Sequence, residues 1–457
     1  MRYDVLILGA GPGGAAAARA LAAAGKSVAL AEDTHWGGTC LNCGCIPTKM
    51  LLGATAPAAL LHGHERLRVM KGEISIDYKA LQSRVGRFVK GSSQALAKGL
   101  TAAGVTLLEG RGVITGAGCA VVRAADGTET VCEAEDIILA CGSRSAAFAG
   151  LTPDGQAVLD STGVLNLPEV PESLIIVGAG AIGLELGDFF AAMGTKITLV
   201  EAAPHIAPTE DDDIAAEMAK AQSKAGKTCL TGVKAKSLVT AQGQAVLTLE
   251  DGQTLTAAKA LVAVGRLPNT DGLDCEKAGC RLNRRGFVET DENLQAAPHV
   301  YAIGDVNGRV LLAHAAEHQA AYVARRIAGQ AQGAYASGPV PSCFYGSTEI
   351  MRVGATVRDL LRAGRTDVCV SQVPLTLNAI AQACGNSGGF VKVVWGGGAI
   401  AGMAAIGHGV SHLVTAAQLL MLRGATPENL HDIMFAHPTL DEILPAAIRA
   451  PQVLVRA

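Results

Sequence analysis

A fingerprint for binding a dinucleotide occurs twice in this chain, and this repeat constrains the fold more than any other feature. Each copy is an apolar, β-type run that enters the pattern G-x-G-x-x-G, namely VLILGAGPGG at 5–14 and LIIVGAGAIG at 174–183. A helical stretch follows, and then a short strand that ends in an acid, SVALAE at 27–32 and KITLVE at 196–201. Two β-α-β units of this kind predict an α/β fold with two Rossmann-like domains.

The residues of each copy suit the parts of a dinucleotide. The glycines allow a tight turn, close approach of a pyrophosphate and close helix–sheet packing, and the helix N-terminus attracts phosphate. The terminal acid can accept hydrogen bonds from ribose hydroxyls, and at position 201 it would repel a 2′-phosphate, which favours NAD(H) over NADP(H). A single glycine-rich turn of this kind also occurs in proteins that bind no dinucleotide, but two complete copies indicate that this chain binds dinucleotides. The predicted residues are Gly9, Gly11, Gly14 and Glu32 in the first copy and Gly178, Gly180, Gly183 and Glu201 in the second.

Composition narrows the function classes. The chain has 457 residues, which is more than a single hydrophobic core usually supports, so we expect several domains. Its 49% of apolar residues and its 55 glycines are typical of layered α/β domains and not of a disordered protein. A formal charge of −3 without a basic run argues against a nucleic-acid partner. The N-terminus reads as a strand rather than a signal peptide, and no window holds eighteen consecutive apolar residues. We therefore expect a cytoplasmic protein without a membrane partner.

Three of the twelve cysteines cluster, in the run GGTCLNCGCIPTK at 37–49. The other nine are scattered singly, and we expect them to be buried small hydrophobes. The cluster directly follows the first β-α-β unit, which suggests a redox disulphide that faces a cofactor. Local geometry favours the pair Cys40–Cys43, because residues three apart on a helix are neighbours. Cys40 and Cys45 are five apart and would lie on different faces of a regular helix.

The whole chain resembles the dihydrolipoamide dehydrogenases, which belong to the flavoprotein disulphide reductases. The resemblance rests on motifs in the family's order: GAGPGG, GGTCLNCGCIPTK, VGAGAIGLELG, VAVGRLPNT, YAIGDV, LAHAAEHQ and HPTLDE. It implies FAD in the first site, NAD in the second, a homodimer, and a lipoyl-bearing partner from a 2-oxoacid dehydrogenase or glycine cleavage system. It also implies an FAD-binding domain at 1–145, an NAD-binding domain at 146–268, a central domain at 269–338 that completes the FAD site, and an α+β interface domain at 339–457.

The resemblance assigns roles to individual residues. Cys40 would exchange with substrate sulphur, and Cys45 would lie against the flavin, which makes Cys40–Cys45 the working disulphide. The first cysteine would be held before the regular helix begins. His437 would be the base in the opposite subunit's site, oriented by Glu442. Attack on a disulphide needs a thiolate, and a histidine that titrates near neutrality can take the thiol proton. The implied cofactor contacts are Gly38, Thr39, Lys49, Gly112, Gly142, Asp305 and Ala313 for FAD, and Ile182, Glu185 and Gly265 for NAD.

Some readings stay open at this point. Glu442 also fits a capping box that begins at Thr439, and Glu185 fits a first-turn acid that the helix dipole favours. His314 and His318 have metal-ligand spacing, but no cysteine or acid cluster joins them, so we predict no metal site. The chain departs from the family pattern at Cys43, Cys141, Phe435 and Asp441.

Other functions compete with the one that the resemblance implies. The alternatives are another NAD(P)H-dependent disulphide reductase and a scaffold subunit of a multienzyme complex. Elsewhere we expect helix over 50–100, short strands over 103–142, a helix over 311–327 and a helix at the C-terminus.

Overall fold

The computed structural model describes residues 1–456, and these form two compact units. The first unit comprises Met1–Thr48, Gln82–Ala146 and Gly265–Ser337. The second comprises Lys49–Leu81, Ala147–Val264 and the chain from Gly338 onward. Each unit contains one of the two predicted β-α-β repeats, and the α/β class is confirmed. The four functional domains inferred from the sequence stay a prediction.

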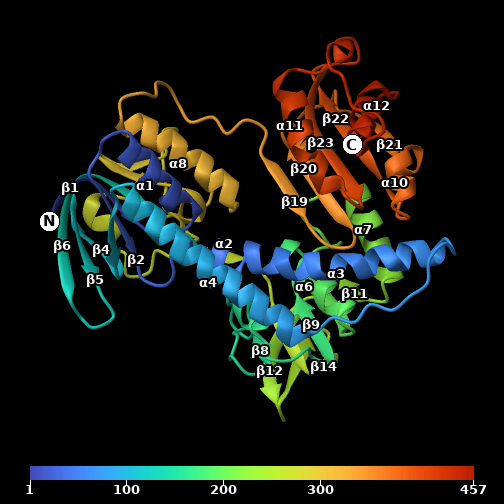
Figure 1. The fold of residues 1–457 in the computed structure, drawn as a ribbon, viewed down its shortest axis with the longest axis horizontal. Helices are drawn as coiled ribbons and strands as arrows, with labels where there is room; N and C mark the ends of the chain where they lie inside the picture. The colour runs from blue at the N-terminus through green and yellow to red at the C-terminus, as the bar shows by residue number, and fades with distance from the viewer. Residues whose placement is uncertain (457) are drawn as a thin grey trace. The chain divides into compact units, whose positions relative to one another are not determined.

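An eight-stranded sheet lies at the centre of the first unit (Figure 1). Its strands follow the order β17-β18-β6-β1-β2-β3, and β4 and β5 join it through β6. The pairs around β1, β2, β3, β6 and β18 are parallel, as expected for a dinucleotide-binding fold. The strands are β1 (Arg2–Leu8), β2 (Val28–Glu32), β3 (Thr106–Glu109), β4 (Arg111–Gly116), β5 (Cys119–Arg123), β6 (Glu129–Leu139), β17 (Gln295–Ala297) and β18 (Val300–Ala302).

Strand β1 is buried on both faces, so its side chains supply two cores. Val5 and Ile7 belong to the cluster that contains α1 (Pro12–Ala23) and α8 (Ala313–Ile327), and these helices lie side by side in Figure 1. Leu6 and Leu8 belong to the cluster on the opposite face. This division follows from the two-residue period of a strand. It explains why the sequence shows a continuous apolar run rather than alternation.

The long helical region after the cysteine motif is interrupted twice. Helix α2 (Gly38–Cys43) ends at Gly44, and α3 (Cys45–Arg66) begins directly after it. Residues 67–77 are not helical, and Asp77 accepts the Ala80 N–H at 2.9 Å where α4 (Tyr78–Ala102) begins. The prediction of helix over 50–100 is therefore wrong for this connection. The stretch Gly38–Arg66 is long and apolar enough to cross a membrane, a test that core helices also pass.

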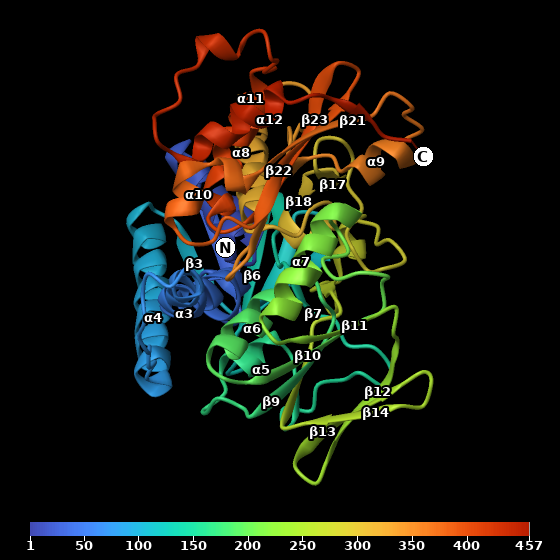
Figure 2. The same cartoon turned by 90° about the vertical axis from the view of Figure 1, so that its right-hand side faces the viewer.

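The second unit contains the second dinucleotide-binding fold, with α6 and α7 beside its parallel strands (Figure 2). Its sheet has the order β11-β10-β9-β15-β8, and an antiparallel sheet β12-β13-β14 accompanies it. The strands are β8 (Val158–Leu159), β9 (Ser173–Val177), β10 (Lys196–Glu201), β11 (Thr228–Thr231), β12 (Ala235–Ala241), β13 (Gln244–Leu249), β14 (Thr254–Ala257) and β15 (Lys259–Val262), and the helices are α5 (Ser161–Leu165), α6 (Ala181–Ala192) and α7 (Asp212–Lys224).

A six-stranded sheet of order β19-β20-β23-β22-β21-β24 forms the C-terminal part of the second unit. Short β24 follows the last helix, so the expectation that the chain ends in a helix is wrong. Val453 and Val370 are paired in this final antiparallel contact. The elements are β19 (Pro341–Phe344), β20 (Glu349–Gly354), α9 (Val357–Arg362), β21 (Cys369–Pro374), α10 (Ala379–Ala383), β22 (Gly389–Gly396), β23 (Ala399–Gly407), α11 (Val414–Leu422), α12 (Ile443–Arg449) and β24 (Val453–Leu454).

A buried lysine joins the two parts of the second unit. The Nζ atom of Lys392 on β22 donates to Asp211 at 2.9 Å and to Asp213 at 2.5 Å, both at the start of α7. The Lys392 side chain is 2% exposed. Because a buried charge is costly unless it is paired, these carboxylates stabilise the ammonium inside the protein.

Candidate active site

The first glycine-rich turn has the geometry that the fingerprint predicts. Gly9 has φ 106°, and a Cβ there would lie 2.4 Å from the Ala140 carbonyl oxygen. A Cβ at Gly14 would lie 1.9 Å from the Gly9 carbonyl oxygen, whereas a Cβ at Gly11 would have nothing within 4 Å. Two glycines therefore serve packing, and the middle one leaves the backbone open on the side from which a pyrophosphate would approach.

The second turn repeats this geometry position by position. Gly178 has φ 102° and packs against the Ala263 carbonyl, and a Cβ at Gly183 would lie 2.0 Å from the Gly178 oxygen. Gly180 again has nothing within 4 Å. Neither α1 nor α6 has a side-chain cap or an acid in its first turn. Their N-terminal N–H groups thus fit the phosphates of FAD and NAD, and Ile182 lies in the first turn of α6.

The two strand-end acids are held in the same way. Glu32 Oε2 accepts the Ala10 N–H at 2.7 Å, and Glu201 Oε2 accepts the Ala179 N–H at 2.8 Å. Glu201 Oε1 accepts one further N–H, from Ala203, which leaves acceptor capacity on both oxygens for a ribose. Glu32 Oε1 accepts from three groups, so the capacity of this carboxylate lies mainly on Oε2.

The remaining residues predicted for FAD surround the first turn or stabilise its sheet. A Cβ at Gly38 would lie 2.8 Å from Gly11 Cα, so the cysteine segment packs on the glycine turn, and Thr39 follows it. A Cβ at Gly112 would meet Leu8, which is a packing role. Gly142 has φ 68° and follows the strand end against which Gly9 packs. Ala313 is the first residue of α8.

Asp305 is fixed by two residues to which the sequence assigned no role. Ser143 Oγ donates to Asp305 Oδ2 at 2.5 Å, and Arg266 Nε donates to Ser143 Oγ at 2.6 Å. Arg266 also lies 3.6 Å from Asp305. Both partners lie in the paired strands β7 (Ser143–Ser145) and β16 (Arg266–Pro268). Arg266 belongs to the motif VAVGRLPNT, so the motif identified the segment but not the contact. Gly265, which was predicted to bind NAD, is the first residue of Gly265–Ser337, a segment of the first unit.

The cysteine motif is divided between two helices. Cys40 and Cys43 lie in α2, and Cys45 is the first residue of α3. Gly44 separates the helices, and a Cβ there would lie 3.0 Å from the Thr39 carbonyl oxygen. The expectation that Cys40 precedes regular helix is therefore wrong. Because the helix breaks at Gly44, the five-residue spacing of Cys40 and Cys45 is not that of a continuous helix.

Lys49 and Glu185 form the predicted ion pair. Lys49 Nζ lies 2.6 Å from Glu185 Oε2, and Glu185 is 5% exposed. Burial raises the pKa of Glu185, and the Lys49 ammonium opposes this rise. Tyr345 completes the group, since its N–H donates to Glu185 Oε1 at 3.1 Å and its ring centroid lies 4.6 Å from Lys49 Nζ. Glu185 is the fifth residue of α6, so the alternative of a first-turn acid is wrong.

His437 and Glu442 form a second pair in the C-terminal part. His437 Nδ1 lies 2.9 Å from Glu442 Oε1, and Thr439 N–H donates to Glu442 Oε2 at 2.9 Å. The capping box and the contact with the histidine therefore occur together in one carboxylate. The Thr439 N–H and then the His437 ring lower the pKa of Glu442. The ring of His437 is 79% exposed, so its Nε2 edge is open to a reacting group.

The predicted residues thus form groups within each unit. The first unit holds the first glycine turn, Glu32, the three cysteines and Asp305. The second holds Lys49 with Glu185, the second glycine turn with Glu201, and His437 with Glu442. No metal-binding cluster of histidines, cysteines and acids occurs within residues 1–456. His318 instead contacts the Tyr335 hydroxyl at 3.0 Å.

Two family models cover almost the entire chain. Residues 3–320 match the pyridine nucleotide-disulphide oxidoreductases, and residues 340–448 match the dimerisation domain of the same proteins. This chain belongs to the pyridine nucleotide-disulphide oxidoreductases. The predictions of an oxidoreductase that uses FAD and NAD are confirmed with the family, and the dimerisation domain supports a homodimer.

Curated relatives of this oxidoreductase extend over the same length. Dihydrolipoyl dehydrogenase of Chlorobaculum tepidum is 36% identical over 448 residues, which cover 96% of this chain and 95% of the relative. Dihydrolipoyl dehydrogenase of Mycobacterium tuberculosis is 34% identical over 449 residues, with 97% and 96% covered. The resemblance inferred from the motifs is therefore confirmed.

Solved structures of the family agree with the fold. LpdA from Mycobacterium tuberculosis superposes with a TM-score of 0.89 at 26% identity and covers 98% of this chain and 99% of its own. The HOCl-induced flavoprotein disulphide reductase RclA from Escherichia coli gives a TM-score of 0.84 at 27% identity, again with 98% and 99% covered.

Proposed function

We propose that this oxidoreductase is a dihydrolipoyl dehydrogenase, which oxidises protein-bound dihydrolipoamide with NAD⁺ through a Cys40–Cys45 disulphide. The observation that carries the proposal is the near-full-length likeness to proteins of that name at 34–36% identity. The geometry of the cysteine motif and of the His437–Glu442 pair supports it.

On the thiol side, Cys40 is the sulphur that exchanges with substrate and Cys45 is the sulphur next to the flavin. A substrate thiolate attacks Cys40, the Cys40–Cys45 bond breaks, and Cys45 leaves as a thiolate. The second substrate thiol then displaces Cys40, so a substrate disulphide forms and two electrons stay on the cysteine pair. FAD, held by the residues of the first glycine turn, would supply the chemistry that carries these two electrons from the cysteine pair to NAD⁺.

His437 is the base for this exchange. Its Nε2 takes the proton from the attacking substrate thiol, and Glu442 on Nδ1 holds the ring's orientation and stabilises the imidazolium. The proton acceptor sits on the exposed edge of the ring, where a substrate arm can reach it. In the proposed homodimer this residue serves the site of the other subunit.

On the nucleotide side, Lys49 and Glu185 flank the position at which the nicotinamide meets the flavin. Glu201 binds the adenosine ribose and excludes a 2′-phosphate. The first glycine turn, Glu32 and Asp305 hold the FAD pyrophosphate, ribose and ribityl chain. We further propose that the protein is cytoplasmic and serves a lipoyl-bearing protein of a 2-oxoacid dehydrogenase or glycine cleavage system.

A second candidate substrate is a disulphide other than lipoamide. The likeness to Escherichia coli RclA, whose name is that of a flavoprotein disulphide reductase, favours it at 27% identity and a TM-score of 0.84. Cys43 places an additional thiol between the two working cysteines, and this is the feature of the chain that would change which disulphide it accepts.

The test is an assay of the FAD-loaded protein with NAD⁺ and dihydrolipoamide, monitored as NADH formation. We expect turnover of about 10 s⁻¹ or above, the ordinary range for an enzyme with its own substrate. Reduced glutathione serves as the comparison thiol. A protein whose flavin is reduced by NADH, but which produces no NADH from dihydrolipoamide, would have another substrate and would overturn the proposal.

A further inference from the structure

Two cysteines that belong to none of the sequence motifs lie together in the core of the first unit. Cys275 and Cys280 are 0% and 4% exposed and pack in the cluster that holds Leu6 and Leu139. The sequence predicts that these cysteines are buried and lie singly. They are buried, but they lie next to each other. Five positions separate them, as five separate Cys40 from Cys45, although the local structure differs.

The backbone fixes this contact. Cys275 begins the 3₁₀ turn Cys275–Ala278, which ends at Gly279 with φ 87°. The Gly279 N–H donates to the Glu276 carbonyl at 2.9 Å, and the Cys280 N–H donates to the Cys275 carbonyl at 3.3 Å. These two bonds make a Schellman motif, in which the first and the last residue commonly bring their side chains together. In this chain both of those side chains are thiols.

The two thiols differ in chemical character. They form a hydrogen bond with each other, which raises the pKa of Cys275 and lowers the pKa of Cys280. Glu276 Oε2 lies 3.8 Å from the Cys275 sulphur and also favours the protonated form of Cys275. Cys275 is therefore the proton donor of the pair, and Cys280 is the sulphur that ionises first.

We propose that Cys275 and Cys280 are a second redox-active thiol pair, which hydroperoxides oxidise to a disulphide. The Cys280 thiolate attacks the peroxide, an S–O bond forms, the O–O bond breaks and water leaves. The Cys275 sulphur then attacks the Cys280 sulphenic acid, so that the S–S bond forms and a second water leaves. One hydrogen peroxide and two thiols thus give one disulphide and two waters. Oxidation of Cys275 and Cys280 does not depend on dihydrolipoamide being the substrate of the enzyme.

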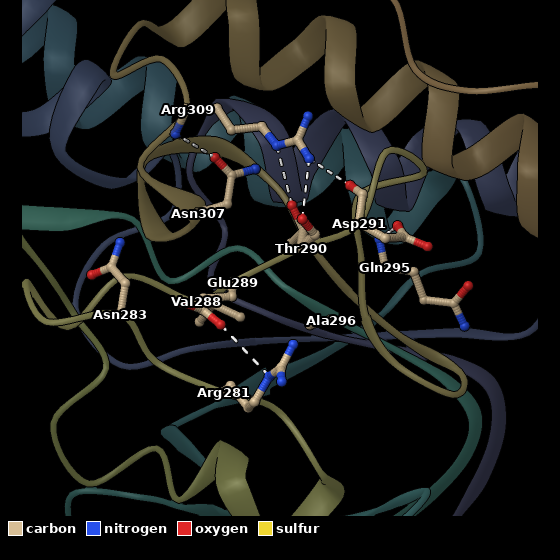
Figure 3. Close-up of a pocket in the computed structure, with 10 residues that line it drawn as sticks. All are labelled: Arg281, Asn283, Val288, Glu289, Thr290, Asp291, Gln295, Ala296, Asn307 and Arg309. Atoms are coloured by element: carbon tan, nitrogen blue, oxygen red, sulfur yellow. Dashed lines mark hydrogen bonds and ion pairs between the residues drawn. The ribbon is translucent and has the colours of Figure 1, made fainter.

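A pocket of about 530 Å³ lies in the first unit, within the segment that also holds the two cysteines (Figure 3). Arg281, which follows Cys280, lines it, and so does Val288. Val288 also belongs to the cluster that holds the two cysteines. The pocket therefore brings small solutes to the outer side of that cluster, from which local opening of the turn gives access to Cys280.

The pair can be mapped sharply because Lys277 lies between the two cysteines. Trypsin separates them into peptides 267–277 and 278–281, which stay joined only if the disulphide exists. The folded, FAD-loaded protein is first reduced with dithiothreitol and freed of it, then exposed to hydrogen peroxide, quenched in acid, alkylated in denaturant and digested. We expect the linked peptides, the loss of one alkylatable thiol from each of peptides 267–277 and 278–281, and recovery of both with dithiothreitol. The peptide 27–49, which carries Cys40 and Cys45, reports whether the oxidant acted.

Cys132 is the matched control, because it is 0% exposed in the same cluster and its thiol faces the Thr130 carbonyl. It should stay alkylatable under the same exposure. In Cys275→Ser, the hydroxyl can still donate to Cys280 but cannot form a disulphide, so Cys280 should gain oxygen atoms instead of forming a link. If Cys275 and Cys280 stay as alkylatable as Cys132 while peptide 27–49 is oxidised, the pair is structural and the proposal is overturned.

Discussion

His437 Nδ1 lies 2.9 Å from Glu442 Oε1, and the other oxygen of the same carboxylate holds the Thr439 N–H at 2.9 Å. One side chain thus fixes the backbone of the turn and the orientation of the imidazole. A ring that donates through Nδ1 presents its unprotonated Nε2 outward, which is the form that a base requires.

Replacing His437 by Gln should separate the two half-reactions. Turnover with lipoamide should fall by roughly 10²- to 10⁴-fold, the usual contribution of a positioned acid–base group. Reduction of the bound flavin by NADH should survive, because it needs no proton transfer at the thiols. Steady-state and stopped-flow measurements on one preparation decide the matter. An equal fall in both half-reactions would show that His437 is structural.

Glu442 should leave a signature in acid. Its pKa is lower in the folded protein than its ordinary value of 4.5, so the stability it contributes is fully present above that pH. The contribution is lost as the pH falls through the folded pKa. The difference in melting temperature between wild type and Glu442→Gln should therefore shrink as the pH falls below 4.5. A difference that grows in acid contradicts this assignment.

Glu201 should determine the choice of nicotinamide cofactor. The unmodified protein should prefer NADH, and Glu201→Arg should shift the preference toward NADPH by roughly 10- to 100-fold, because one charge-assisted contact replaces a repulsion. The values of kcat/KM with both cofactors measure the shift. Glu217→Arg, at a half-buried acid on α7 whose side chain is 27% exposed, is the control for a general change of charge. An unmodified protein that uses NADPH as well as NADH excludes this role of Glu201.

Cys43 and Cys45 should differ sharply when replaced. If Cys40–Cys45 is the working disulphide, Cys43→Ala keeps most lipoamide activity and Cys45→Ser loses it. Peptide mapping of the oxidised protein after an acid quench identifies the bond directly. A dominant link between Cys40 and Cys43 would mean that the shorter pair, favoured by local helix geometry, is the working one.

Lys392→Met should destabilise the second unit. The change leaves Asp211 and Asp213 without their common ammonium group, and loss of one partner of a buried pair costs about 3–5 kcal/mol. Lys220→Met is the control, since Lys220 is 60% exposed in its pair with Glu217 and should cost at most about 1 kcal/mol. Urea titrations of the three proteins compare their stability. Equal losses of unfolding free energy in the two variants would show that the buried ion pair stabilises the protein no more than the exposed one.

Much of this fold could be predicted because its signals are local. Each glycine fingerprint lies within one strand–turn–helix segment, and the structure shows the same packing at Gly9 and Gly178, at Gly14 and Gly183, and the same hydrogen bond at Glu32 and Glu201. The pairs Lys49–Glu185 and His437–Glu442 followed from motifs, although only the second lies within one short segment.

Other contacts could not be predicted because the partners are distant in the chain and belong to no shared pattern. Tyr345 meets Lys49 and Glu185 from the end of β19, and Arg266 reaches Asp305 through Ser143. The break at Gly44 was missed because glycine inside an apolar, helix-like run does not indicate whether the helix continues. The contact of Cys275 with Cys280 depends on the αL conformation of Gly279, which the spacing of the cysteines does not reveal.

The most direct test of electron transfer through Cys45 is an anaerobic titration of the purified protein with NADH, monitored by absorbance. With one equivalent we expect a flavin spectrum that gains a long-wavelength band from a thiolate against the oxidised ring. Cys45→Ser should lack that band and bleach instead. Bleaching of the wild-type flavin without the band, or the same band in Cys45→Ser, would contradict the transfer of electrons between flavin and Cys45.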